Sequence, residues 1–219
     1  MHGRTRIKIC GITQLNDALF AADAGADALG FVFVEASMRY LIPKQAAAIS
    51  AKLPAFITRV GLFLDTPESV VRATLQNMPE LVPQFHGNES AAYCESFDRP
   101  YIKAVGAAAS VAGQMPDAAA LGAFKSAVGF LYDSHVPGAL GGTGKTFDWT
   151  HLAHDSDVPL ILAGGLSVAN VADAVRTVKP YAVDISSAVE QSKGIKDNNL
   201  VTQFIAAVIQ ADFAMNESL

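Results

Sequence analysis

The sequence predicts an α/β protein that folds as one (β/α)8 TIM barrel with a parallel eight-stranded core. Two observations lead to this expectation. Eight short apolar runs recur at roughly regular spacing, and alanine-rich helical patterns lie between most of them. The chain has 219 residues, of which 51% are hydrophobic and 17% charged, so it can bury one sizeable core. No linker, low-complexity segment or second core interrupts it, and we expect a single domain over residues 1–219.

The eight expected strands are short and mostly apolar. Runs such as Pro159–Ala163 are apolar throughout, which is typical of strands covered on both faces and therefore of parallel pairing. Pro83 argues against the strand that contains it, because proline cannot donate a hydrogen bond to a sheet. In chain order the strands are Ile7–Cys10, Ala28–Val34, Thr58–Leu64, Leu81–Phe85, Tyr101–Val105, Ala127–Tyr132, Pro159–Ala163 and Ala182–Ile185.

Helical patterns separate these strands, and several begin with residues that favour helix starts, such as serine, asparagine or proline. Between the fifth and sixth strands, Gly113, Pro116 and Gly122 interrupt the pattern. The alternation of strand and helix supports parallel crossovers and closure into a barrel. The expected helices are Asn16–Ala24, Pro43–Leu53, Pro67–Met78, Ser90–Phe97, Ser167–Val178 and Asn199–Ala214.

Composition and charge exclude several classes of function. No apolar run approaches the roughly 18 residues that span a bilayer, and the basic start lacks a signal-peptide core, so we expect a cytoplasmic protein. A net charge of −5 without a Lys/Arg cluster argues against nucleic acid as a partner. Cys10 and Cys94 lack the spacing of a disulfide framework or a zinc site. His151 and His154 have helical spacing, but no carboxylate or cysteine motif accompanies them, so we expect no metal site.

Two reactive side chains stand where expected strands end. Cys10 is followed by Gly11, and Asp133 follows the sixth strand and leads into a glycine-rich segment. In parallel α/β proteins the carboxyl ends of the strands carry the chemistry. A thiol and a carboxyl group there could serve one substrate as base and acid. The alternatives are a small buried core residue for Cys10, and a helix cap or solvated loop residue for Asp133.

Glycine and serine pairs follow the last three strands. The segment Gly141–Thr146 (GGTGKT) is not a P-loop, because that motif needs glycine five positions before Gly144, where Ala139 stands. Its backbone N–H groups can still approach an anion closely. Gly164–Gly165 follows strand seven, and Ser186–Ser187 follows strand eight. Loops at these places in (β/α)8 enzymes commonly bind a phosphate, although they could also be ordinary turns.

Seven motifs follow one another along nearly the whole chain: Lys8–Thr13 (KICGIT), Gly30–Phe33 (GFVF), Ser37–Tyr40 (SMRY), Gln84–Gly87 (QFHG), Gly141–Trp149 (GGTGKTFDW), Ala163–Leu166 (AGGL) and Asp184–Glu190 (DISSAVE). In this combination and order the chain resembles the phosphoribosylanthranilate isomerase family. It departs at Met38, where the family usually has proline, at Pro83, where an apolar strand residue is usual, and at Ala188, where glycine is frequent. These changes concern local loop geometry and remove no group that does chemistry.

The resemblance implies an enzyme of tryptophan biosynthesis that needs no metal or organic cofactor. Its reaction is the Amadori rearrangement of N-(5'-phosphoribosyl)anthranilate to 1-(o-carboxyphenylamino)-1-deoxyribulose 5-phosphate. By resemblance, Asp133 is the acid that opens the furanose ring and Cys10 the base that takes the C2' proton. Asp133 must then keep a proton near neutral pH, and Cys10 must be partly thiolate. Lys8 precedes Cys10 by two residues on the same side of the strand, and its charge favours the thiolate.

The implied substrate carries two anions, so we expect two receptors. Arg39 is the candidate for the anthranilate carboxylate, which a guanidinium can hold through two hydrogen bonds, although a surface arginine is the alternative. Asp184 could accept a hydrogen bond from a sugar hydroxyl or the bridging amine. His86 is either a ligand contact or a structural histidine. The phosphate is expected on the backbone of Gly141, Gly142, Gly164, Gly165, Ser186 and Ser187.

Three other functions remain open: the related isomerase of histidine biosynthesis, a ribulose-phosphate epimerase, and a non-catalytic phosphosugar-binding barrel. Cys10 argues against the first, which is expected to use an aspartate base at the first strand. The lack of metal-type histidines at strand ends argues against the second, and the intact pair Cys10 and Asp133 against the third. The expected partner is a small phosphosugar-anthranilate substrate, with neither nucleic acid nor a membrane, for a monomer or homodimer.

Overall fold

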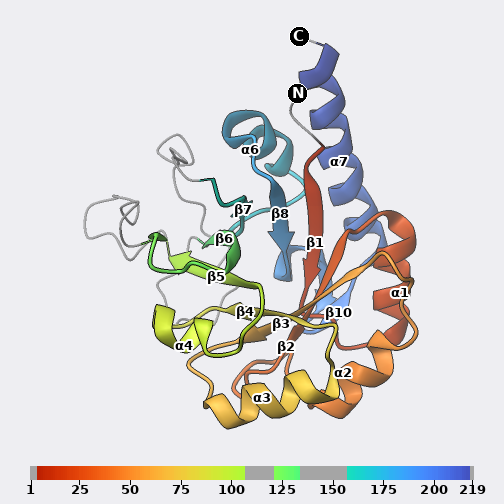
Figure 1. Cartoon of the computed structure of the whole chain (residues 1–219). Helices are drawn as coiled ribbons and strands as arrows, with labels where there is room; N and C mark the ends of the chain where they lie inside the picture. Colours follow the sequence, from red (N-terminus) through yellow and green to blue (C-terminus); the bar gives the residue numbers. More distant parts are fainter. Residues whose placement is uncertain (1–3, 107–120, 134–156, 218–219) are drawn as a thin grey trace.

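The computed structural model describes residues 4–106, 121–133 and 157–217, and a closed barrel of eight parallel strands lies at its centre (Figure 1). Each strand pairs with its neighbours in chain order, and the eighth closes the barrel on the first. The expected eight-stranded parallel barrel is thus confirmed. The strands are β1 (Arg6–Cys10), β2 (Ala28–Val32), β3 (Thr58–Phe63), β4 (Val82–Phe85), β5 (Tyr101–Gly106), β6 (Ala127–Asp133), β7 (Leu160–Leu162) and β8 (Ala182–Ile185).

Helices lie outside the barrel, as Figure 1 shows for α1, α2 and α3. The final helix is the longest described one and packs against both the first helix and the helix before β8. No helix in the described part of the chain is both long and apolar enough to cross a membrane. The helices are α1 (Leu15–Ala24), α2 (Pro43–Ser50), α3 (Glu68–Asn77), α4 (Ala91–Glu95), α6 (Val171–Val178) and α7 (Asn198–Glu217).

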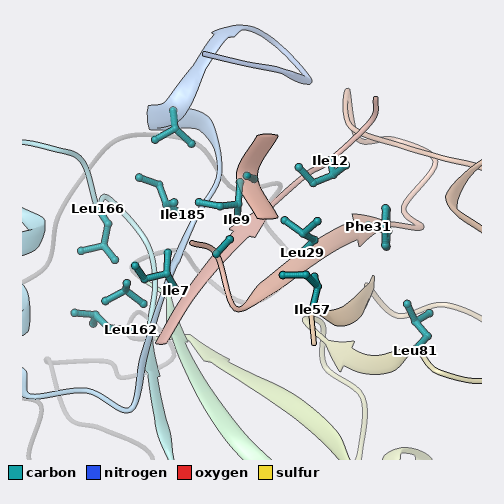
Figure 2. Packing of buried hydrophobic residues seen from close by; sticks show 14 of the residues in the cluster. Ile7, Ile9, Ile12, Leu29, Phe31, Ile57, Leu81, Leu162, Leu166 and Ile185 are labelled. Atoms are coloured by element: carbon teal, nitrogen blue, oxygen red, sulfur yellow. The ribbon is translucent and has the colours of Figure 1, made fainter. Parts of the chain in front are cut away.

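The period of two along each strand divides the core into two layers. Outward side chains pack under the helices, and Figure 2 shows Ile7 and Ile9 of β1 beside Leu29 of β2 and Ile185 of β8. Inward side chains form a second, smaller cluster that fills the barrel. Its buried members are Val60, Ile102, Ala104, Leu131, Ile161, Ala163 and Ala182. Apolar side chains fill the middle of the barrel, so the inward-facing polar side chains lie toward the ends of the strands.

Two short strands after β8 were not expected from the sequence. A 3-10 turn over Ser187–Val189 leads into β9 (Glu190–Ser192), which pairs antiparallel with β10 (Ile195–Lys196). The backbone N–H of Lys196 donates to Asp17 of α1 at 2.8 Å, and the Gly194 carbonyl accepts from the Thr13 hydroxyl. The β9–β10 ribbon is therefore fastened to the loop and helix that follow β1, next to the end of that strand.

The expected strands agree with the observed ones to within two residues at each end. Pro83 does lie inside a strand: it stands opposite Gly61 in the register of β4 with β3. The expected helices exist but several are shorter, as where α4 covers only Ala91–Glu95. Residues 107–120, most of the glycine-interrupted segment before β6, lie outside the described residues. So do His151 and His154, whose spacing had suggested a helix face.

Candidate active site

Polar side chains converge where β1, β4, β6 and β8 end. Lys8 and Cys10 share the inward face of β1, because they are two residues apart, and Lys8 stands opposite Asp184 in the pairing of β1 with β8. Asp133 is the last residue of β6, and His86 directly follows β4. The structure thus brings together the five predicted side chains that lie on strands or directly after them.

Lys8 and Asp184 form an ion pair inside the barrel. The Lys8 ammonium donates to both carboxylate oxygens at 2.9 Å, and the two side chains are only 4% and 9% exposed. Burial opposes the ammonium charge, but the carboxylate of Asp184 and the nearby Cys10 outweigh burial and raise the pKa of Lys8. Burial also raises the pKa of Asp184, and the charge of Asp133 adds to this effect. Asp133 and Asp184 are therefore electrostatically coupled.

Cys10 is buried beside two cations, Lys8 and Lys196. As expected, the charge of Lys8 favours the thiolate. Both lysines do lower the pKa of Cys10, but burial of the thiol outweighs them, and the net effect is a raised pKa. The sulfur is held against Gly30 of β2: a Cβ at that position would lie 2.7 Å from Sγ and 3.2 Å from the Lys8 ammonium. Glycine at position 30 therefore leaves the space that the thiol of Cys10 and the ammonium of Lys8 occupy.

Asp133 faces a histidine that a glutamine holds in place. His86 Nε2 lies 3.5 Å from an Asp133 carboxylate oxygen, and the Gln84 side-chain amide nitrogen lies 3.1 Å from His86 Nδ1. Nδ1 thus meets Gln84, and Nε2 is the ring nitrogen that faces Asp133. Gln84 is fully buried in the barrel, and its Oε1 has no hydrogen-bond partner among the described residues. His86 is thus placed next to the candidate acid.

Arg39 reaches across the end of β1 to the β9–β10 ribbon. Its Nε and Nη2 both donate to the carboxylate of Glu190 at 2.7 Å. The aliphatic stem passes so close to Gly11 that a Cβ there would collide with it, and Gly11 also has a positive φ of 77°. The hydrogen bonds to Glu190 and the negative charge of Glu190 raise the pKa of Arg39, although partial burial opposes this effect. Arg39 is therefore a fixed part of the site rather than a free surface arginine.

The expected phosphate loops are described in part. Gly164 and Gly165 both have a positive φ, 73° and 67°, which side chains other than glycine rarely adopt. Asn170 closes the loop, since its side-chain amide donates to the Gly165 carbonyl at 2.9 Å and its Oδ1 accepts from Ser167 N at 2.8 Å. Ser186 and Ser187 follow β8 at the same end of the barrel. Gly141 and Gly142 lie outside the described residues.

Four further residues of the site were not predicted: Gly30, Gln84, Glu190 and Lys196. Three of them stand inside the motifs GFVF, QFHG and DISSAVE, which carried a sequence signal without indicating these roles. Lys196 had no such signal. Its ammonium donates to Glu190 at 2.9 Å and to the Ser186 carbonyl at 3.1 Å, through a ribbon that the sequence did not predict.

The fold and the site define a class of protein. A closed (β/α)8 barrel carries a thiol, a carboxyl group and several cations at the carboxyl ends of its strands, together with glycine and serine loops after β7 and β8. This arrangement is that of a barrel enzyme that acts by acid–base chemistry on an anionic substrate. Residues 7–207 match the family described as N-(5'phosphoribosyl)anthranilate (PRA) isomerase. The chain belongs to this family.

Similar proteins cover almost the whole chain. N-(5'-phosphoribosyl)anthranilate isomerase of Hahella chejuensis is 50% identical over 210 residues, which are 94% of this chain and 94% of that protein. The crystal structure of the Thermotoga maritima phosphoribosyl anthranilate isomerase superposes with a TM-score of 0.81 at 37% identity, covering 94% of this chain and 99% of that one.

A further solved structure contains a ligand. It is a phosphoribosyl anthranilate isomerase in complex with reduced 1-(o-carboxyphenylamino)-1-deoxyribulose 5-phosphate, at a TM-score of 0.77 and 34% identity, covering 94% of this chain and 99% of that one. Another describes monomers generated from the dimeric enzyme of Thermotoga maritima, at a TM-score of 0.77, 34% identity and the same coverage.

Proposed function

We propose that this chain catalyses the Amadori rearrangement of N-(5'-phosphoribosyl)anthranilate to 1-(o-carboxyphenylamino)-1-deoxyribulose 5-phosphate in tryptophan biosynthesis. One observation carries the proposal beyond family membership: the thiol of Cys10 and the carboxyl group of Asp133 stand at the same end of one barrel, on strands β1 and β6. The rearrangement needs one acid and one base, and these are the side chains available for the two roles.

Asp133 serves as the acid. The furanose ring opens when its ring oxygen gains a proton and the C1'–O bond breaks, while the lone pair of the anthranilate nitrogen forms a double bond to C1'. The nitrogen keeps its hydrogen, so the product is a protonated Schiff base. A carboxyl group can supply that proton only if it holds one. The charge of Asp133 is among the causes that raise the pKa of Asp184, so the two carboxyl groups influence one another. His86, 3.5 Å from the Asp133 carboxylate, orients it.

Cys10 serves as the base. It takes the proton from C2' of the Schiff base, and the electron pair of that bond moves toward the nitrogen to form an enolamine. The enolamine then tautomerises to the ketone. The thiolate is the reactive form, and the ammonium groups of Lys8 and Lys196 stabilise it against the cost of burial. The thiolate is thus the less populated form of Cys10, and these cations lower the free energy needed to form it.

Receptors for the two anions of the substrate complete the site. We propose that Arg39 holds the anthranilate carboxylate, and its position against Gly11, close enough to Cys10 for an electrostatic interaction, supports this role. The backbone around Gly164, Gly165, Ser186 and Ser187, with Gly141 and Gly142, is proposed to hold the phosphate. The ligand of the similar isomerase carries both a carboxyl group and a phosphate, which supports two receptors.

Three wider expectations accompany this function. We expect the chain to form one domain over residues 1–219, and to act as a monomer or a homodimer. The dimeric isomerase of Thermotoga maritima supports the homodimer. A cytoplasmic location is expected of a biosynthetic enzyme that acts on a charged small molecule.

The test is turnover of the proposed substrate by the purified protein. N-(5'-Phosphoribosyl)anthranilate is fluorescent, and its fluorescence should disappear as the aminoketose forms, with the product identified by mass and absorbance. The substrates of the histidine-pathway isomerase and of ribulose-phosphate epimerase serve as matched phosphosugar controls and should remain unchanged. Saturable binding of the proposed substrate without turnover would instead identify a non-catalytic binding barrel.

A further inference from the structure

Glu190 connects two cations of the candidate site, Arg39 and Lys196. Its carboxylate accepts from Arg39 Nε and Nη2, both at 2.7 Å, and from the Lys196 ammonium at 2.9 Å. The side chains of Glu190 and Lys196 are only 5% and 1% exposed. Burial opposes the charge of Glu190, but the bonds from Arg39 and Lys196 outweigh it and lower its pKa. The carboxylate is therefore ionised and held from two sides.

Lys196 fixes Glu190 relative to the barrel. Its ammonium also donates to the carbonyl of Ser186, which directly follows β8, at 3.1 Å. Its backbone N–H donates to Asp17 of α1. Glu190 lies on the β9–β10 ribbon. Through Lys196, its carboxylate is connected to the residue that follows β8 and to helix α1.

The bonds from Arg39 use one particular edge of its guanidinium. A guanidinium can bind carboxylates along two edges, the side edge with Nε and Nη2 and the end edge with Nη1 and Nη2. Glu190 occupies the side edge. Among the described residues, Nη1 makes no hydrogen bond, so the end edge retains donors for a second carboxylate.

We propose that Glu190 is a positioning residue for substrate recognition: it locks Arg39 by the side edge so that the end edge meets the anthranilate carboxylate. This inference rests on the proposed function, which assigns that carboxylate to Arg39. Without Glu190, the long side chain of Arg39 regains rotamer freedom that must be lost again each time a ligand binds. Glu190 therefore strengthens carboxylate binding without contacting the ligand.

Two ligands that differ only in the carboxyl group isolate this effect. One is reduced 1-(o-carboxyphenylamino)-1-deoxyribulose 5-phosphate, and the other is the same compound with a phenyl ring that lacks the carboxyl group. Calorimetry gives both dissociation constants, and their ratio measures carboxylate discrimination. We expect a ratio of about a hundred for the wild-type protein, since a bidentate charged contact is lost with the carboxyl group.

Glu190→Gln should lower this ratio by about tenfold and raise KM, with kcat nearly unchanged. In an Arg39→Ala background, Glu190→Gln should change the ratio no further, because its effect acts through Arg39. Glu68→Gln is the matched control, since Glu68 makes a similar 2.7 Å pair with Arg72 on the surface of α3. That variant should keep the wild-type ratio.

The results separate the inference from the function on which it rests. A wild-type ratio near one refutes the carboxylate receptor itself. A normal wild-type ratio that Arg39→Ala abolishes but Glu190→Gln preserves refutes only the positioning role. If Glu190→Gln weakens the binding of both ligands equally, Glu190 has a general structural role. If Glu190→Gln tightens binding, Glu190 competes with the ligand for Arg39. Either result refutes the proposal. If Glu190→Gln fails to fold, Glu190→Asp retains the charge but shortens the contact, and should also lower the ratio.

Discussion

Replacing Gly30 with alanine adds one methyl group to the inward face of β2, directly against the proposed base. The new Cβ would lie 2.7 Å from Cys10 Sγ, and ordinary contact begins at 3.4 Å, so the sulfur must retreat by about 0.7 Å. The same methyl group would lie 3.2 Å from the Lys8 ammonium, which holds Asp184. The mutation therefore shifts the proposed base, Cys10, and presses on one of the two lysines whose charge favours its thiolate.

A shift of this size should reduce both catalysis and stability, and only the loss of catalysis is specific to this position. Misplacement of a reacting group by about 1 Å can cost about a hundredfold in rate, so we expect kcat to fall between about tenfold and a hundredfold. Overpacking of a barrel interior typically costs about 1–3 kcal/mol. Substrate affinity should change little, because the added methyl group does not touch the proposed anion receptors.

Gly129→Ala is the matched control. Gly129 lies on β6, and a Cβ there would approach Ile161 Cδ1 to 2.9 Å, the flexible end of a core side chain. The same substitution at this position should lower stability by a similar amount and leave kcat near its wild-type value. The assays are steady-state fluorescence kinetics and denaturant unfolding. A folded Gly30→Ala enzyme with wild-type kcat would refute the placement of the catalytic thiol against Gly30.

Three further predictions concern the charged groups of the site. Burial raises the pKa of Cys10, so the rate of its alkylation by iodoacetamide should still rise about tenfold per pH unit at pH 8–9. The Cys10→Ala variant corrects this rate for reaction at Cys94. A plateau of the rate below pH 8 contradicts the raised pKa. Asp184→Asn leaves the ammonium of Lys8 buried without its partner, so it should lower the free energy of unfolding by at least about 3 kcal/mol. A loss below about 1 kcal/mol would mean that the ion pair is not buried as described. Arg39→Ala should chiefly raise KM in steady-state assays, and an unchanged KM would place the anthranilate carboxylate elsewhere.

The barrel was predictable because its signals are local. Each strand is a short apolar run, and the alternation along β1 places Lys8 and Cys10 on one face without any knowledge of the rest of the chain. Strand ends at one edge of a parallel barrel then bring Cys10 and Asp133 to the same end. The structure agrees with these expectations.

The network around Arg39 was not predictable for physical reasons. Arg39 and Glu190 are separated by 151 residues, and their contact depends on a ribbon of three- and two-residue strands that lack an apolar pattern. The net ionisation of Cys10 was not predictable for another reason. Neighbouring charges can be read from strand alternation, but the cost of burying the thiol depends on the packed barrel, and that cost prevails.

The central claim is that Cys10 and Asp133 act as base and acid on a bound substrate, and fluorescence kinetics of Cys10→Ala and Asp133→Asn test it most directly. Binding of the reduced product analogue is measured on the same samples. Cys94→Ala, at a buried cysteine of α4, and Asp23→Asn, at an exposed position of α1, serve as controls. We predict that kcat falls by about 10²–10⁴-fold in both site variants while analogue affinity is retained, with both controls unchanged. A near-normal kcat in either folded site variant would contradict the role of that residue.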